Sequence, residues 1–537
     1  MDYKKLAAAG MSAALLLSIG GSALAKAPGS SPRESTPISQ SRPSDSGETS
    51  SGAPKKGTAG LRSESDRVPE SGPAKKAPDA SGEQMNEKPS QKPTRKPDQK
   101  SDAATDSSRN NNQTEKKSET KTESGKHRSS KQTTETLSDQ GTKPETSSGG
   151  KQRKQSAQIE YDAANSVSAS ATGASYTSTN DSENAVLVSG DKVTLTNATV
   201  DKTGSASGDN ADFYGVNAAV LAKDGAELTI EGAKITSNGA HANGVFSYGE
   251  GTTVEISDST ITTTGNTSGG LMTTGGGTMI ANNLTVKTSG SSSAAIRSDR
   301  GGGTVIVNGG SYESNGVGSP AIYSTADITV NEATLTSTAS EGVIVEGKNS
   351  VTLNGVTLTD TNTKHAGKSS TDKNIFLYQS MSGDASVGTA KFEANDSTIV
   401  TNRGDTIYVT NTTAEIELKN NQLVNNANGA LLRVEAAKWG TAGKNGGDVT
   451  LELENQKASG DIVIDNISQV SMTLKDNSTY EGAINGADTA KKADVTLETG
   501  SKWTLTGDSY LSALDGDTSG IDLNGHTLYV GGNVWTK

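Results

Sequence analysis

The sequence predicts an all-β protein whose main part is a single-stranded right-handed parallel β-helix, a solenoid, preceded by a long disordered linker. Three observations predict this class. A corner motif recurs at a nearly constant spacing from about residue 159 onward. The runs around each corner alternate apolar with polar residues, as strands with one buried face do. Aromatic residues make up only 4% of the chain, which suits a narrow interior of Val, Ile, Leu and Ala.

Residues 1–25 have the three parts of a secretory signal peptide. Lys4 and Lys5 give a positive start, an apolar stretch follows, and Ala23-Leu24-Ala25 supplies the small residues that signal peptidase reads. We therefore expect cleavage after Ala25 and a secreted, extracellular protein, with association with the cell surface left open. No later run approaches eighteen apolar residues, so we expect no transmembrane segment after signal cleavage.

Residues 26–158 form a Ser/Pro/Lys/Glu-rich segment without Phe, Trp or Tyr. Such a composition buries too little apolar surface to offset the conformational entropy lost on folding, which predicts a disordered linker. The segment holds 25 basic and 18 acidic residues. We interpret it as a spacer, and the alternative is that its positive charge binds an anionic polymer such as a teichoic acid or a lipid surface.

Residues 159–537 carry the repeat, as in LTIEGAKITSNG (228–239) and VTLNGVTLTDTN (351–362). Most corners follow one another at 23 to 26 residues, which corresponds to one coil of a solenoid. Two longer steps, of 35 and 41 residues, place extra sequence at 204–215 and 361–390. The corner residues are Asn197, Gly232, Asp258, Asn283, Gly309, Glu332, Gly355, Asp396 and Asn420.

The last part of the repeat region, about 501–537, departs from the motif and holds two of the three Trp residues. A solenoid needs atypical terminal coils to shield the open end of its core. We therefore predict a C-terminal cap that includes Trp503, Leu523 and Tyr529.

Composition excludes several classes of site. The chain has no Cys, and its four His residues show no metal-ligand spacing, so we expect no thiol chemistry and no histidine-based metal site. Residues 159–537 hold 23 basic and 43 acidic residues, and we expect no nucleic-acid partner. We also expect no cofactor.

With its coil length and corner pattern, the region 159–537, about 70% of the chain, resembles the right-handed parallel β-helix (pectin-lyase-like) repeat proteins, in particular the exported, adhesin-like type of bacteria. The resemblance implies a fold more than an activity. The partners that it implies are an extracellular polysaccharide, a cell-wall polymer or a host surface glycan.

Candidate ligand-binding residues come from the strand that precedes each corner. If Val245, Leu271, Ile296, Ile322 and Ile407 point inward, alternation turns their neighbours outward. One long face would then present aromatic rings, arginines and carboxylates at the spacing of one coil, which suits an extended glycan. A shift of one residue would reverse the faces. The candidates are Phe246, Tyr248, Arg297, Asp299, Arg300, Tyr323, Glu346, Tyr378, Tyr408 and Arg433.

We therefore expect a non-enzymatic, adhesin-like or polysaccharide-binding surface protein. The alternative is a polysaccharide lyase or a glycoside hydrolase that acts on an extended glycan, with a uronate glycan as one option. Calcium is the cofactor to consider if the lyase alternative holds. Arg297, Asp299 and Arg300 form the compact charged triplet of the face, and Asp299 and Glu346 would lie two coils, roughly 10 Å, apart. The Gly-His-Gly signature of family hydrolases is absent. Thr-x-Thr pairs such as Thr357/Thr359 raise ice binding as a third class, which ordinary β-propensity explains better.

Overall fold

The computed structural model describes residues 159–362 and 372–537. The predicted signal peptide (1–25) and linker (26–158) lie outside this part of the chain. Its regular structure is mostly β-strand, with one α-helix, α1 (Asp209–Tyr214), and one short 3-10 helix, η1 (Thr518–Gly520). Neither helix has the length and hydropathy needed to cross a bilayer.

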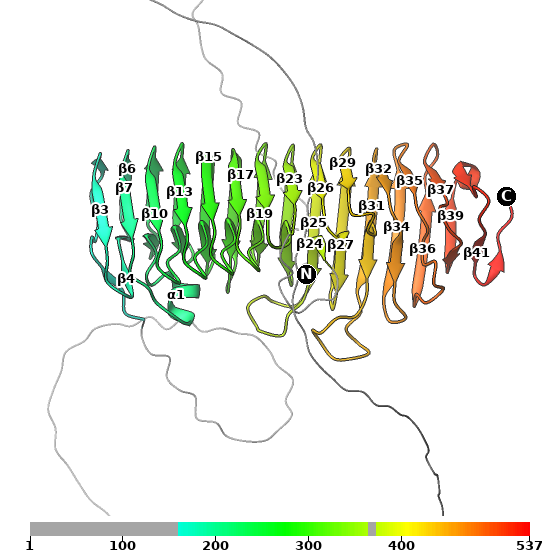
Figure 1. The fold of residues 1–537 in the computed structure, drawn as a ribbon, viewed down its shortest axis with the longest axis horizontal. Coiled ribbons are helices and arrows are strands. Elements are labelled where there is room, and N and C mark those ends of the chain that lie inside the picture. Colours follow the sequence, from blue (N-terminus) through cyan, green and yellow to red (C-terminus); the bar gives the residue numbers. More distant parts are fainter. Residues whose placement is uncertain (1–158, 363–371) are drawn as a thin grey trace, which may run out of the picture. The chain divides into compact units, whose positions relative to one another are not determined.

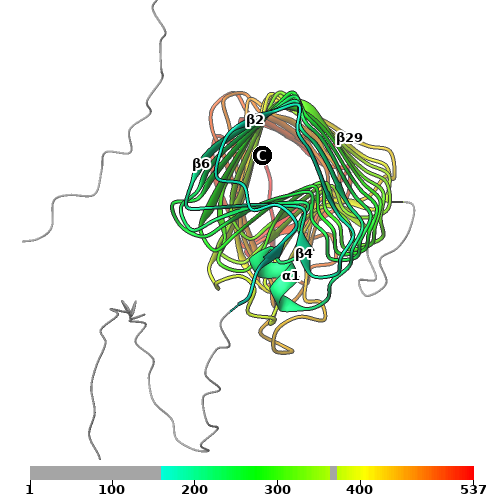
Figure 2. The ribbon, with the colours of Figure 1, turned by 90° about the vertical axis from the view of Figure 1, so that its left-hand side faces the viewer.

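Successive turns of the chain stack along one axis, and strands pair in parallel with their equivalents in the next turn (Figure 1). Seen end-on, the turns superimpose into one closed outline (Figure 2). The all-β class and the parallel stacking are thus confirmed, and the arrangement is consistent with a parallel β-helix.

One wall of the coil is an eleven-stranded parallel sheet, which we call the site sheet. Its strands follow each other by one turn of the chain. In order they are β5 (Val186–Ser189), β8 (Val220–Lys223), β11 (Val245–Tyr248), β14 (Leu271–Thr274), β16 (Ile296–Ser298), β18 (Ile322–Ser324), β21 (Val343–Glu346), β24 (Lys373–Tyr378), β27 (Asp405–Thr410), β30 (Leu432–Val434) and β33 (Ile462–Ile464).

The other walls belong to a 22-stranded sheet, the main sheet, which bends at the corners. Before the corners lie β2 (Ala171–Thr172), β6 (Lys192–Thr196), β9 (Glu227–Glu231), β12 (Thr253–Ser257), β19 (Asp327–Asn331), β22 (Ser350–Asn354), β25 (Thr389–Asn395), β28 (Thr413–Lys419), β31 (Asp448–Glu454), β34 (Gln469–Lys475), β36 (Lys492–Leu497) and β39 (Ala513–Gly516). After them lie β3 (Ser175–Ser178), β7 (Thr199–Lys202), β10 (Lys234–Ser237), β13 (Thr260–Thr263), β20 (Thr334–Ser337), β23 (Thr357–Asp360), β26 (Thr398–Thr401) and β29 (Gln422–Asn425). The long strands β15 (Gly277–Thr288) and β17 (Gly303–Ser314) run through the corner.

Three small sheets complete the described residues. Among the pairings in this part of the chain, β41 with β42 is the antiparallel one. The strands are β1 (Asp162–Ala163) with β4 (Glu183–Asn184); β32 (Lys457–Ser459), β35 (Thr479–Glu481), β37 (Lys502–Thr504) and β40 (Ile521–Asp522); and β38 (Ser509–Leu511), β41 (Leu528–Val530) and β42 (Asn533–Val534).

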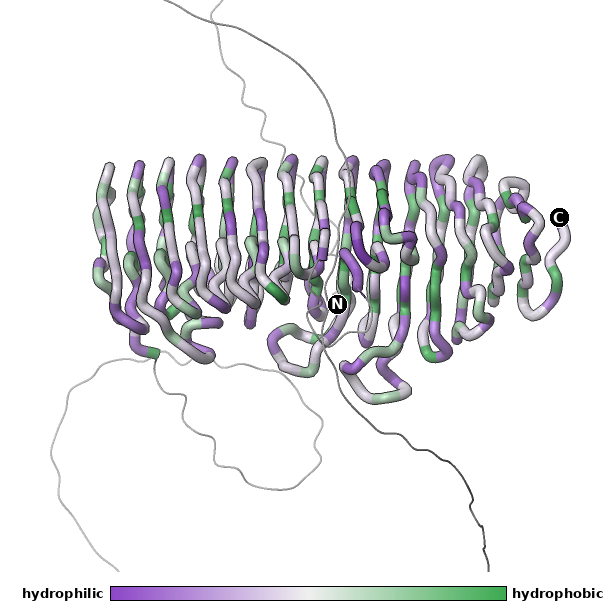
Figure 3. The backbone as a smooth tube through the Cα atoms, viewed as in Figure 1, coloured by the Kyte–Doolittle hydropathy of each residue, from purple (hydrophilic) through white to green (hydrophobic). Residues whose placement is uncertain are grey.

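The interior is a column of stacked apolar side chains, and apolar segments recur in successive coils (Figure 3). On the site sheet, Val245 pairs with Leu271, and Ile296 follows and then Ile322. Each is at most 1% exposed. Since the walls are parallel strands, residues at equivalent positions of each coil lie directly above one another. The predicted inward positions are confirmed.

The corners have the backbone conformation that their residue types predict. All nine corner residues have φ between 47° and 67°, in the left-handed region that Gly, Asn and Asp tolerate best. Neighbouring corners also contact one another, since the Asn283 side chain donates to Asp258 Oδ1 at 2.7 Å. Beside them runs an amide ladder, in which each Asn side chain donates to the previous one at 2.8–3.0 Å: Asn282, Asn308, Asn331, Asn354 and Asn395.

The two predicted insertions both contain chain that lies outside the sheets. The first contains α1. The second includes residues 363–371, outside the described residues, and a loop that joins β24 to β25 and that we call loop 379–388. A further loop, 435–447, joins β30 to β31.

Trp503, one of the residues of the predicted cap, lies inside the coil. Its side chain is 0% exposed, and its strand pairs in register with the coils on both sides, opposite Tyr480 and Ile521. The aromatic ring is part of the interior column, next to the Tyr480 ring at 6.3 Å. Leu523 and Tyr529 lie in the last turn, where Leu523 packs against the core and the Tyr529 ring stacks on Tyr510 at 4.6 Å.

Candidate functional site

The outward residues of the site sheet stack in one column, as their alternation predicts. Backbone pairing places Arg297 beside Met272 and Tyr323, and Tyr408 beside Phe376 and Arg433. The register on which the candidate face depends is therefore confirmed, and the one-residue shift that would have reversed it is excluded.

The column is not, however, the open ladder that we expected. At its N-terminal end Phe246 is 0% exposed and packs with Leu221 and Met272. Tyr248 is half-buried and meets the Tyr214 ring edge-on at 5.5 Å. The cover is α1 and the residues around it. Apolar outward side chains stabilise the folded state when an insertion shields them from water. These two candidates therefore form a small satellite core.

A second satellite core lies further along the column. Phe376 stacks on Tyr378 at 4.6 Å, and Trp439 from loop 435–447 packs 4.8 Å from Tyr378. Tyr378 is 8% exposed and Tyr408 2%. The expectation that these two tyrosines present open rings was therefore wrong, because a loop that the repeat pattern does not include covers them.

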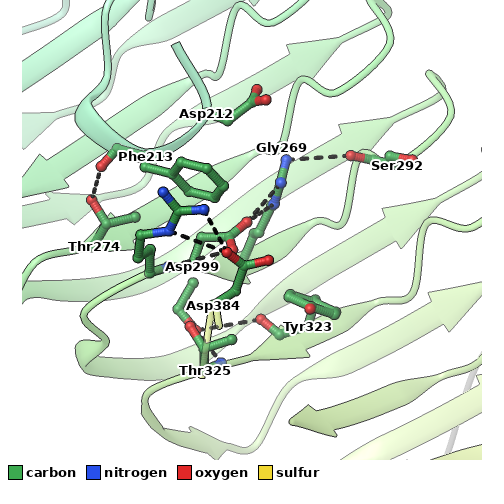
Figure 4. A network of polar contacts seen from close by, with 12 residues as sticks. Asp212, Phe213, Gly269, Thr274, Ser292, Asp299, Tyr323, Thr325 and Asp384 are labelled. Atoms are coloured by element: carbon green, nitrogen blue, oxygen red, sulfur yellow. Dashed lines mark hydrogen bonds and ion pairs between the residues drawn. The ribbon is translucent and has the colours of Figure 1, made fainter. Parts of the chain in front are cut away.

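Between the two covered zones the face is hollow. A cavity of about 250 Å³, which we call the Arg297 recess, is bordered by Arg297, Asp299 and Tyr323 of the sheet. Phe213 of α1 lines it from one side and Asp384 of loop 379–388 from another (Figure 4). The structure thus brings three of the predicted site residues together and adds two that the sequence did not single out.

The Arg297–Asp299 pair forms the floor of the recess. The Arg297 guanidinium donates to Asp299 Oδ2 through Nε at 3.2 Å and through one terminal nitrogen at 2.7 Å. Its other terminal nitrogen donates to the Ser292 carbonyl at 3.3 Å. Burial raises the pKa of the Asp299 carboxyl, and the Arg297 charge opposes this rise. The pair is therefore a fixed polar floor whose guanidinium donors are largely in use.

Arg300 joins the two insertions across the face. Its guanidinium donates to Asp384 Oδ1 through Nε at 3.1 Å and through a terminal nitrogen at 2.8 Å. The same group lies 3.8 Å from the centre of the Phe213 ring and 3.3 Å from Asp209. Arg300 thus positions both sides of the recess, and it is not itself among the lining residues.

Glu346 lies under the recess and fixes the Tyr323 ring. Its carboxylate accepts hydrogen bonds from the hydroxyls of Tyr323 at 2.5 Å and Tyr378 at 2.8 Å, and from the Ser380 hydroxyl. Because Glu346 is only 1% exposed, its expected role as a direct ligand contact is corrected to that of a positioning residue. Burial and the neighbouring Tyr378 and Glu346 raise the pKa of the Tyr323 hydroxyl, so it stays a hydrogen-bond donor.

Arg433 lies apart from the other candidates. Its Nε donates to Asp405 Oδ2 at 2.6 Å. It borders a second, wider cavity of about 650 Å³ together with Asn425, Asn428 and Asp461. The column from Arg297 to Arg433 is interrupted by the Phe376 cluster, so the face offers separate recesses and no continuous groove.

Phe213 and Asp384 were missed because they lie in insertions, where no repeat defines their direction. The signal that was present is the length of the two long coil steps, which marked where extra chain leaves the coil.

The described residues do not provide a coordination site for the calcium ion that the lyase alternative would require. In residues 159–362 and 372–537 no group of three or more His, Cys, Asp or Glu side chains is arranged to hold a metal ion. The residues around Arg297 therefore do not fit a calcium-dependent reaction, and we derive no step through the metal.

Comparison with family models, curated proteins and solved structures found no match for this chain.

Proposed function

We infer that the protein is an exported, non-enzymatic, adhesin-like β-helix that binds glycans of an extracellular or cell-wall polymer on its site sheet. The observation that carries this proposal is the Arg297 recess, where an aromatic ring and a fixed charged floor border a hollow of about 250 Å³. The right-handed, pectin-lyase-like class and the export signal in residues 1–25 belong to the same proposal.

The recess offers the groups that a sugar residue needs. Sugar rings pack their C–H faces on aromatic rings and use their hydroxyls as hydrogen-bond donors. Within the described residues, Asp384 Oδ2 has no hydrogen-bond partner, and Asp299 Oδ1 accepts only from the Arg300 backbone at 3.4 Å. Asp384 Oδ2 is thus free to accept from a sugar hydroxyl, and Asp299 Oδ1 has one long hydrogen bond and can accept another, while Phe213 supplies the apolar contact.

The rigid floor supports binding over turnover. Arg297 is tied to Asp299 by two hydrogen bonds, and Glu346 is held by three hydroxyl groups. Groups that are fixed before the ligand arrives lose little conformational entropy on binding. The Arg297 guanidinium, the basic group of this floor, stays protonated and donates hydrogen bonds, which suits a fixed contact and not a proton acceptor.

The experiment incubates the full chain with a panel of plant, host and bacterial polysaccharides, with and without calcium. Two quantities are measured: polymer retained by the immobilised protein, and soluble oligosaccharides by mass. We expect intact polymers, one or more of them retained, and weaker retention by Phe213→Ala than by the control Tyr529→Ala in the last turn. A panel in which no polymer is retained by any variant would refute glycan binding.

A glycoside hydrolase is the second candidate, and one observation favours it. Asp299 and Asp384 both line the recess, and burial raises the pKa of Asp299, as in an acid that donates a proton to a leaving group. New oligosaccharides that appear with the natural chain and vanish with Asp299→Asn would establish the hydrolase and overturn the binding proposal.

A further inference from the structure

A groove separate from the cavities already described is also bordered by loop 379–388, which contributes Gln379 to it and Asp384 to the Arg297 recess. It has a volume of about 620 Å³ and follows the edge where the main-sheet strands begin, from Thr389 past Thr413 and Asp448 to Gln469. These residues open four successive coils, which span about 14 Å along the axis. We call it the lysine groove.

The charge of the groove is opposite to that of the surrounding protein. Lys444 of loop 435–447 and Lys491, which precedes β36, line it and are exposed. Neither ammonium group has an ion-pair partner within residues 159–362 and 372–537. Asp448 is the one acidic residue of its lining. Residues 159–537 hold 23 basic and 43 acidic residues. Two free lysines in one groove therefore make it locally positive on a protein whose net charge is negative.

The remaining polar groups of the lining suit hydroxyls. Asn411, Thr412, Asn466 and Gln469 add amides and a hydroxyl. Gln379 also lines the groove, is 4% exposed, and its Oε1 has no hydrogen-bond partner in the described residues. Its Nε2 donates to the Ser380 carbonyl at 2.9 Å, which fixes this side chain at the groove.

The walls argue against a peptide as the ligand. The strands that begin at the groove, β25, β28, β31 and β34, are each paired with neighbours on both sides. No strand edge is therefore free to accept an added peptide strand. Hydroxyl-rich ligands with acidic groups use the amides and the two lysines without any backbone pairing.

We propose that the lysine groove binds a segment of an acidic polysaccharide, whose carboxylate or sulfate groups pair with Lys444 and Lys491. This goes beyond the binding proposed at the Arg297 recess, where both arginines are already paired with carboxylates. The two sites take different ligand chemistry, hydroxyls at the recess and anions at the groove, and loop 379–388 borders both.

The test compares a uronic-acid homopolymer with the same polymer after its carboxylates are reduced to alcohols. Binding to the full chain is measured at low and at 0.5 M salt. The groove variant is Lys444→Gln/Lys491→Gln. The control is Lys457→Gln/Lys502→Gln, because these two exposed lysines lie two coils apart on another sheet and carry the same charge. Phe213→Ala is run alongside to report the recess separately.

We expect the groove variant to bind the uronate polymer about tenfold more weakly, because it loses two partly solvated ion pairs with the polymer. The control should keep that affinity, and Phe213→Ala, which reports the recess, should still bind the uronate polymer more tightly than the reduced polymer. Reduction of the polymer, or added salt, should remove most of the difference between natural and groove-variant chains. Equal loss in groove and control variants, equal binding of the reduced polymer, or capture of polyglutamate peptide as tightly as the uronate would each overturn the assignment.

Discussion

The Arg300 guanidinium lies 3.8 Å from the centre of the Phe213 ring, although the two residues come from different coils. The same guanidinium is bound to Asp384, 84 positions further along the chain. One side chain just after β16 thus connects two insertions that the repeat pattern leaves undefined, and each insertion contributes a residue to the lining of the recess.

Replacement of Arg300 should therefore loosen both insertions and leave the coil intact. Arg300→Ala removes one cation–π contact and two partly exposed ion pairs, together worth about 1–2 kcal/mol. We expect faster hydrogen exchange in α1 and loop 379–388, weaker polysaccharide retention, and a small loss of overall stability. The exposed pair Lys287–Glu313 provides the control: Lys287→Ala should change none of these. Unchanged exchange in both insertions would refute the role of Arg300.

Asp360 predicts a pH dependence of stability. It is fully buried in the main sheet between Ser337 and Thr401, and burial raises the pKa of its carboxyl to about 8. The folded state thus binds the proton more tightly than the unfolded chain, whose carboxyl pKa is about 3.9. This group's contribution to stability is complete below about pH 4 and is lost as the pH rises towards 8.

Asp360→Asn removes that titration. At pH 7.5 we expect the variant to be more stable than the natural chain by about 5 kcal/mol, and at pH 4 by little. Denaturant unfolding at several pH values measures the difference. Asp515→Asn, at an exposed position, should show no such trend. A stability difference that is constant from pH 4 to 8 would contradict the raised pKa.

Glu332 predicts a stabilising substitution. It has φ 52°, while the corners on either side are Gly309 and Gly355, with φ 67° and 62°. An L-residue with a long side chain is strained in this conformation, and Gly is not. Glu332→Gly should raise the free energy of unfolding by about 0.5–1 kcal/mol. Glu255→Gly, inside β12, should lower the free energy of unfolding by a similar amount. Denaturant unfolding measures both changes, and a change in the same direction for both variants would refute the corner argument.

Trp503 predicts a large loss of stability. Its ring is buried in the coil and its indole N–H donates to the Gly482 carbonyl at 2.9 Å. Trp503→Ala should cost about 3–5 kcal/mol. Trp535→Ala, in the half-buried chain end, should cost much less. The melting temperatures of the two variants are compared in thermal unfolding. Similar values would contradict the large contribution of the buried Trp503 ring to stability.

The periodic features of the protein could be predicted from the sequence, and the non-periodic ones could not. Corner residues and the inward column of Val245, Leu271 and Ile296 followed from spacing and alternation, because every coil repeats the same packing. Burial of Phe246 and Tyr408 did not follow, since it depends on insertions that have no repeat. Burial of Trp503 in the coil did not follow either, since the repeat motif is lost in this last part of the chain.

The candidate site divides in the same way. Arg297, Asp299 and Tyr323 were found because the strand register brings them to one place. Phe213 and Asp384 were not, because the direction of a side chain in an insertion depends on contacts such as those of Arg300, which only the folded chain shows.

The most direct test of glycan binding at the Arg297 recess is the affinity of the full chain for whichever polysaccharide it retains, measured by titration for the natural chain, Phe213→Ala and Asp384→Asn. Tyr529→Ala and Asp515→Asn serve as controls. We predict that both recess variants bind at least about fivefold more weakly, because each loses either one aromatic contact or one charged hydrogen bond to the ligand. Both controls should bind as the natural chain does. Equal affinity in all five chains would contradict binding at the recess.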